Sequence, residues 1–192
     1  MHAHAPRKRN AAASRRRILD ATRHAFSETG YSHTGIRDIS AAAGTSSTLL
    51  LRYFGSKAGL YEAALRDAMP ADRLCNVSQE ELLDQFPNKM IDHETSIQPL
   101  LMIAMASGAP EAAEVSARVF SELGVGQIAD ALKGRDTRLR ALQISMLSFG
   151  MAFMLRHLPF NDLTEEDRTR ARDWYVSQVR SLMRDPGPGT PN

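Results

Sequence analysis

The chain has 192 residues, a formal net charge of +2, 43% hydrophobic residues and 24% charged residues. This length and composition are ordinary for a globular protein of one or two domains with a buried core. They exclude a membrane-spanning chain, because no stretch reaches the roughly 18 consecutive apolar residues that a spanning helix needs. The basic N-terminus lacks the apolar segment of a secretory signal, and the only cysteine, Cys75, has no partner for an intrachain disulfide. We therefore expect a cytoplasmic protein without membrane contact.

The charge is distributed unevenly along the chain. Residues 1–57 contain ten basic and three acidic residues, whereas residues 58–192 contain fourteen basic and nineteen acidic residues. A basic N-terminal region before an acidic remainder is typical of a protein whose N-terminal region alone binds a polyanion. The alternative is a solvated, charged terminus, since basic termini are common. His2 and His4 lie on an end expected to be unstructured, so we expect neither a metal site nor another cofactor.

The first elements are a disordered arm and a long helix. Residues 1–11 are polar, carry no periodicity and are predicted to be a disordered basic arm. Arg7, Lys8 and Arg9 are suited to follow a phosphate backbone or to enter a minor groove. From residue 12, apolar residues at three- and four-residue spacing predict a helix that ends near Gly30.

The next stretch, TGIRDISAAAGTSSTLLLRYFGSK, predicts two short helices joined by a sharp turn. Thr34 is suited to cap the first helix, and Gly44 is suited to end it in the left-handed conformation. Ile39, Leu50 and Phe54 are predicted to form the small core that holds the two helices together. Helices joined so tightly must cross at a steep angle, as in a helix-turn-helix, whose second helix enters the major groove of DNA.

The remainder of the chain is also helical by its periodicity. A helix over residues 135–158 is apolar on nearly all sides, which predicts burial against more than one neighbour. A last helix, over residues 165–184, begins with three acidic residues that favour the positive end of a helix. No segment shows the period-two alternation of a strand. The predicted fold class is therefore all-α, with a three-helix DNA-binding domain followed by a larger helical domain.

Three segments of the N-terminal third, ILDATRHAFSETGY, TGIRDISAAAGTS and LLLRYFGSKAGLYEAAL, form one pattern across residues 12–69. In unbroken register they resemble the tetracycline-repressor-like (TetR) family of transcriptional regulators. The segment RDTRLRALQISMLSFGMAFMLRHLPF is similar to one group of the family's C-terminal domains. The resemblance is more specific for the N-terminal segments than for the C-terminal one.

The resemblance implies a domain organisation and a function. The expected domains are a helix-turn-helix DNA-binding domain over residues 12–72, a helical effector-binding and dimerisation domain over residues 73–184, and a disordered tail over residues 185–192. Known members are homodimers that bind palindromic operators and release DNA when a small molecule enters the C-terminal domain. We therefore expect a homodimeric repressor in which helices 135–158 and 165–184 of two chains form a four-helix interface.

The residues expected to bind DNA carry polar or cationic side chains, apart from Leu49, whose apolar side chain is suited to contact a thymine methyl. They are Thr34, Arg37, Ser46, Ser47, Thr48, Leu49, Arg52, Tyr53 and Lys57. The guanidinium of Arg37 can bond guanine bidentately, or it can hold a phosphate. The hydroxyls can bond phosphates or bases, and Ser46 can also simply cap its helix. Arg52 and Lys57 match family positions that contact the phosphate backbone.

The recognition helix departs from the family pattern at Leu51, where a tyrosine is usual. This exchange removes a hydroxyl that could bond a phosphate. Two alternatives follow for Leu49 and Leu51. Either they contact the C5-methyl groups of thymines, because apolar contact is how that group is recognised, or they pack on the protein itself.

The predicted effector pocket draws on methionine and aromatic residues of the C-terminal domain. They are Met102, Met105, Phe120, Met146, Phe149, Phe153 and Trp174. Methionine fills irregular space and adapts to varied apolar ligands. Few charged residues fall among these positions, so we expect a small, largely apolar effector. The alternative for each of these residues is an ordinary position in the core.

Two other functions remain open on the sequence alone. The first is an enzyme built on a helical bundle, but the chain has no Glu-x-x-His pair of the di-iron kind and no nucleophile-elbow or phosphate-loop pattern. We therefore expect no enzymatic activity. The second is an interaction module whose helix-turn-helix no longer binds DNA, and Leu51 keeps that alternative open.

Overall fold

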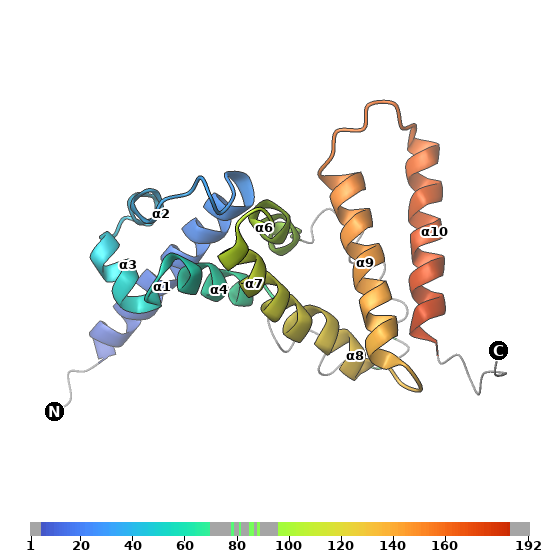
Figure 1. Ribbon diagram of the computed structural model, residues 1–192, viewed down its shortest axis with the longest axis horizontal. Helices are drawn as coiled ribbons and strands as arrows, with labels where there is room; N and C mark the ends of the chain where they lie inside the picture. The colour runs from blue at the N-terminus through green and yellow to red at the C-terminus, as the bar shows by residue number, and fades with distance from the viewer. Residues whose placement is uncertain are drawn as a thin grey trace. The chain divides into compact units, whose positions relative to one another are not determined.

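The structure is a computed structural model that describes residues 5–69, 78, 81, 85, 86, 88 and 96–184 (Figure 1). Within these residues every regular element is helical, which confirms the predicted all-α class. The helices are α1 (Ala5–Glu28), α2 (Ile36–Ala42), α3 (Ser47–Phe54), α4 (Lys57–Ala68), α6 (Gln98–Ala106), α7 (Pro110–Val119), the π-helix η1 (Phe120–Gly126), α8 (Gln127–Ala131), α9 (Thr137–Arg156) and α10 (Glu165–Met183). The predicted tail, residues 185–192, and Cys75 lie outside the described residues.

The chain forms two compact units. The first, here called the head unit, contains residues 1–70 and 98–119, and the second, the body unit, contains residues 71–97 and 120–192. Helices α6 and α7 belong to the head unit because they pack against α1 and α4. The family resemblance implies that these two helices belong to the C-terminal domain, residues 73–184. That division follows the order of the chain, whereas the two units described here follow the packing of the helices.

Helix α1 corrects the prediction for the N-terminal arm. Residues 1–11 were expected to lack regular structure, but the backbone is helical from Ala5 onward. Pro6 is compatible with this start, since a residue in the first turn of a helix needs no backbone N–H donor. Alanine, arginine and lysine, which make up most of the following positions, are all good helix formers.

The core of the head unit is built around three aromatic rings. Phe26, Tyr31 and Tyr61 lie with ring centroids 5.4–5.5 Å apart, and Phe26 and Tyr61 are fully buried. The hydroxyl of Tyr61 lies 2.7 Å from the hydroxyl of Ser116 on α7 and donates to the carbonyl of Met102 on α6 at 3.2 Å. A buried hydroxyl needs such partners, so Tyr61 ties α4 to both helices.

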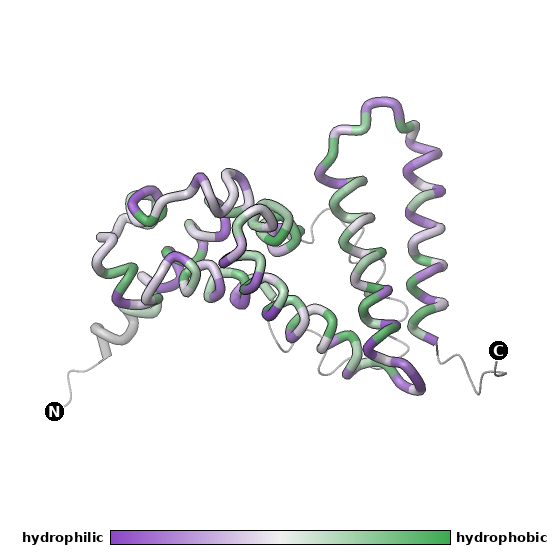
Figure 2. Tube along the Cα trace, in the orientation of Figure 1, coloured by the Kyte–Doolittle hydropathy of each residue, from purple (hydrophilic) through white to green (hydrophobic). Residues whose placement is uncertain are grey.

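In the body unit α9 and α10 run side by side in opposite directions (Figure 1). Ile144, Tyr175 and Val179 are fully buried between them, and the hydroxyls of Ser148 and Tyr175 lie 2.8 Å apart. Figure 2 shows that hydrophilic residues predominate on α10, whereas α9 carries more hydrophobic ones. Among the described residues, no helix is long and apolar enough to cross a membrane.

Arg140 is a buried arginine at the base of this hairpin, with 5% of its surface exposed. Its guanidinium donates to the carbonyls of Leu182 at 2.7 Å and Met183 at 2.9 Å, at the end of α10. It also donates to the carbonyls of Lys133 at 2.8 Å and Arg135 at 2.9 Å, in the turn before α9. Arg140 therefore joins three segments of the body unit through backbone acceptors.

Candidate nucleic-acid interface

The start of α2 differs from the sequence prediction at Thr34. The residue that caps α2 is Gly35, whose N–H donates to a carboxylate oxygen of Asp38 at 2.9 Å. Thr34 is only 4% exposed, and its hydroxyl donates to the carbonyl of Gly30 at 2.7 Å. The expectation that Thr34 caps α2 is therefore wrong, whereas contact between Thr34 and DNA stays a prediction. The hydroxyl is turned inward, where it satisfies the carbonyl of Gly30, a glycine in the left-handed conformation.

The turn between α2 and α3 agrees with the sequence prediction. Gly44 has a φ of 60°, the left-handed region that glycine adopts without strain, and α2 ends there. Ser46 caps α3 by accepting a hydrogen bond from the N–H of Leu49 at 3.2 Å. The hydroxyl of Ser47 lies 2.9 Å from that of Ser40 on α2. The Ser40–Ser47 contact fixes the two helices to each other, and Ser40 was not singled out from the sequence because a lone helical serine carries no signal.

Several of the predicted DNA-binding residues have exposed side chains on the motif. Thr48, Arg52 and Tyr53 are exposed on α3, and Arg37 is exposed on α2. Leu50 is fully buried, as is Ile39 on α2, which confirms both as core residues. Leu49 is half-buried, whereas Leu51 is 41% exposed. The polar and cationic groups therefore lie on the face that the core does not use.

Lys57 is placed differently from the other predicted contacts. Its ammonium lies 4.3 Å from the centroid of the Tyr31 ring, a cation–π arrangement. Burial lowers the pKa of Lys57, and the nearby Glu111 acts in the opposite direction. The hydroxyl of Tyr31 donates to the Glu111 carboxylate at 2.8 Å, and burial together with this bond raises the pKa of Tyr31. Contact between Lys57 and a phosphate stays a prediction.

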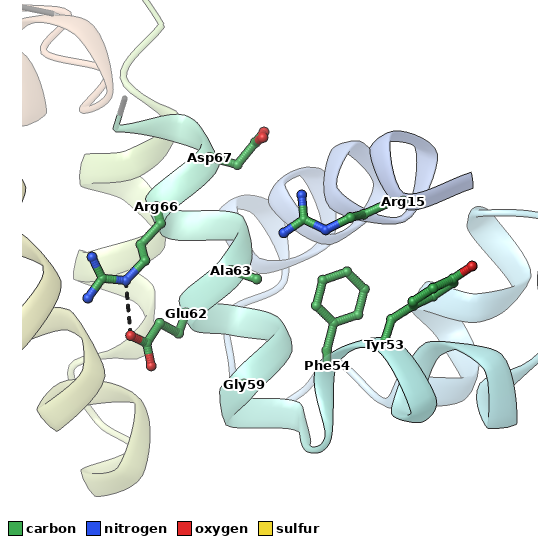
Figure 3. Close-up of a pocket in the computed structure, with 8 residues that line it drawn as sticks. All are labelled: Arg15, Tyr53, Phe54, Gly59, Glu62, Ala63, Arg66 and Asp67. Carbon is green, nitrogen blue, oxygen red and sulfur yellow. Dashed lines mark hydrogen bonds and ion pairs between the residues drawn. The ribbon is translucent and has the colours of Figure 1, made fainter. Parts of the chain in front are cut away.

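Arg15 brings a further positive charge beside the recognition helix. Its guanidinium carbon lies 5.7 Å from the centre of the Phe54 ring, above an open hollow between α1, the end of α3 and α4 (Figure 3). The hollow is lined by Arg15, Tyr53, Phe54, Gly59, Glu62, Ala63, Arg66 and Asp67. Glu62 is bonded by Arg66 and Arg118, and Asp67 is paired with Arg23. Both acidic side chains of the hollow, Glu62 and Asp67, are thus paired with arginines of the same unit.

Comparison with known proteins identifies the family. A family model described as bacterial regulatory proteins of the tetR family matches residues 18–64, and one described as a tetracyclin repressor-like C-terminal domain matches residues 80–183. The chain belongs to the TetR family of transcriptional regulators. The predicted fold, a helix-turn-helix domain followed by a helical C-terminal domain, is thereby confirmed.

Individual TetR relatives match the chain to different extents. RutR of Escherichia coli K12, an HTH-type transcriptional regulator, is 41% identical over 63 residues, which are 33% of this chain and only 30% of RutR. A TetR-family regulator from a Rhodococcus species has a similar structure, with a TM-score of 0.69, 21% identity, and coverage of 90% of this chain and 100% of that one. NalD of Pseudomonas aeruginosa, the secondary repressor of the MexAB-OprM multidrug efflux pump, has a TM-score of 0.64, 20% identity, and coverage of 91% and 99%. At these identities the two structures support the TetR fold alone.

The residues predicted to form the TetR effector pocket are divided between the two units. In the head unit, Met102 is fully buried and Met105 is 43% exposed. In the body unit, Met146 is 64% exposed and Trp174 is 56% exposed. The remaining three, Phe120, Phe149 and Phe153, are half-buried. The effector pocket and its lining stay a prediction for this chain.

Proposed function

We propose that this TetR-family chain is a homodimeric, cytoplasmic repressor that binds a palindromic operator and is released by a small, largely apolar ligand in its C-terminal domain. The observation that supports it best is the outward face of α2 and α3. Arg37, Thr48 and Arg52 are exposed there, while the side chains behind them are buried or bonded within the protein. Two such faces, related by the two-fold axis of a dimer, would match the two half-sites of a palindrome.

The proposed dimer uses the helices over residues 135–158 and 165–184. Leu139, Leu142 and Met146 share one face of α9 and are 56%, 44% and 64% exposed, and Trp174 on α10 is 56% exposed. Large apolar side chains exposed together on a soluble chain are typical of an interface. A second copy of the same hairpin would cover them, and a two-fold axis would place identical residues opposite one another.

Binding to DNA is tested first without knowledge of the operator. We expect the purified protein to bind a random duplex at low salt and to lose affinity steeply as salt is raised, because protein–phosphate contacts release counterions. Fluorescence anisotropy at two salt concentrations measures this. Selection from a random DNA pool then gives the operator, and inverted repeats are expected among the selected sites. Salt-independent binding, or no binding, would instead favour an interaction module that has lost its DNA function.

Arg37 and Arg52 are expected to act in different ways. Arg52→Ala should weaken binding to all sequences alike and reduce the salt slope by about 1, as loss of a phosphate contact does. Arg37→Ala should cost about 1–3 kcal/mol with the selected operator and relax the preference at one base pair. Anisotropy with the operator and with single-base variants measures both effects. Lys133→Ala removes an exposed cation of the body unit outside the proposed dimer helices; it is the control and should change neither.

Release of the operator by a ligand is tested with the same anisotropy measurement. Apolar compounds are added to the protein–operator complex, and loss of anisotropy reports release. A true effector also raises the thermal stability of the free protein, since a ligand that binds only the folded state stabilises it. A compound that releases DNA without stabilising the free protein acts on the DNA or unfolds the protein, and would not support the proposal.

A further inference from the structure

The hydroxyl groups at the start of α3 are already used within the protein. Ser46 accepts the hydrogen bond from the N–H of Leu49 that caps the helix, and Ser47 bonds to Ser40 on α2. A hydroxyl committed in this way has less capacity left for a base edge. Side chains further along the exposed face of α3 are therefore better placed to contact bases.

That exposed face contains an apolar side chain between polar ones. Thr48, Leu51 and Arg52 follow the i, i+3, i+4 spacing of a single helix face, and all three are exposed. Leu51 is 41% exposed, while its neighbour Leu50 is fully buried and supplies the anchor of α3 in the core. Leu50 is therefore the buried anchor of α3, while Leu51 keeps a large part of its hydrocarbon on the surface. Its hydrocarbon is presented on the same surface as the arginine expected to hold phosphate.

We propose that Leu51 is a specificity-determining residue that contacts the C5-methyl group of a thymine in each operator half-site. The inference rests on the proposed function and deepens it, because it names a base feature that the α3 face recognises. In the major groove the thymine methyl is the one group recognised by apolar contact, and every other feature is a hydrogen-bond donor or acceptor. An exposed leucine on a recognition helix is complementary to that methyl. Contact removes both hydrocarbon surfaces from water, which is favourable.

The test removes the methyl group and nothing else. In the selected operator each thymine is replaced in turn by deoxyuridine, which keeps all hydrogen-bonding groups. Dissociation constants are measured by anisotropy for the wild-type protein and for Leu51→Ala. We expect one position per half-site at which the replacement weakens wild-type binding by about fourfold, and by about 15-fold when both half-sites are changed. The same replacement should have no effect on Leu51→Ala.

Two further variants test whether the effect belongs to Leu51 and not to Leu49, and whether it depends on an apolar side chain. Leu49→Ala, at the half-buried neighbouring leucine, should keep the effect of deoxyuridine. Leu51→Gln keeps the length of the side chain and should lose the effect, and circular dichroism checks that each variant is folded. The inference is overturned if no deoxyuridine weakens wild-type binding, if the effect persists in both Leu51 variants, or if Leu49→Ala alone abolishes it. If selection yields no operator at all, the proposed function itself has failed, and the two failures are thereby distinguished.

Discussion

Replacing Arg140 with alanine is expected to lower the free energy of unfolding by about 3–5 kcal/mol. The side chain is 5% exposed, and its guanidinium donates to four backbone carbonyls. Two of these, on Leu182 and Met183, lie at the end of α10, where carbonyls have no partner within the helix and a positive charge is favourable. Alanine leaves these acceptors without their donor and leaves a cavity where the guanidinium was.

The measurement is urea or thermal unfolding followed by circular dichroism. Arg138→Ala is the matched control: it lies two residues earlier on the same helix, is exposed, and makes one hydrogen bond, to the hydroxyl of Ser121 at 2.8 Å. Its expected cost is below about 1 kcal/mol, as for most exposed positions. Arg140→Lys should recover only part of the loss, because an ammonium cannot reproduce the planar fork of a guanidinium. Equal stability of the Arg138 and Arg140 variants would contradict this account.

Replacing Met146 with arginine is expected to convert the proposed dimer into a monomer and to weaken operator binding by more than about 100-fold. Met146 is 64% exposed in the single chain, on the same face of α9 as Leu139 and Leu142. In a two-fold interface the substitution occurs twice, so two charges must be buried against apolar surface without partners. A monomer also loses the gain in affinity that comes from binding two half-sites with linked heads.

Light scattering after size exclusion measures the mass, and anisotropy measures operator binding. Ala117→Arg, at an exposed position on α7 in the head unit, introduces the same side chain away from the proposed interface and should leave the dimer intact. Circular dichroism checks that both variants are folded. A wild-type protein that is monomeric at micromolar concentration would remove the basis of this prediction. A Met146→Arg variant that remains dimeric would exclude this face of α9 from the interface.

Local signals in the sequence were enough to predict the helix-turn-helix. The end of α2 at Gly44 and the cap of α3 at Ser46 depend on residues within one turn of the helix, and both are confirmed. The core positions Ile39 and Leu50 followed from helical periodicity, which is equally local. The arm is predicted less well, because a lack of apolar periodicity indicates disorder, although the residues from Ala5 onward favour a helix.

The roles of several side chains depended on partners far away in the chain. Lys57 lies over the ring of Tyr31, and Tyr31 bonds to Glu111, which is 80 residues later. Arg140 finds two of its four acceptors more than 40 residues later, at the end of α10. No periodicity or motif encodes such pairs, because they arise only when the helices pack. The sequence placed these residues on helices but did not reveal what they contact.

Local spacing, caps and motif residues are sufficient to predict that the chain is helical, that it belongs with the TetR regulators, and where its recognition helix begins and ends. Which side chains the helix-turn-helix can offer to DNA depends instead on how its helices pack. Thr34 is turned inward and Ser47 is engaged by Ser40, whereas Leu51 remains exposed. The physical reason is that exposure and hydrogen-bond partners are set by neighbouring helices, and the sequence of one helix does not contain them.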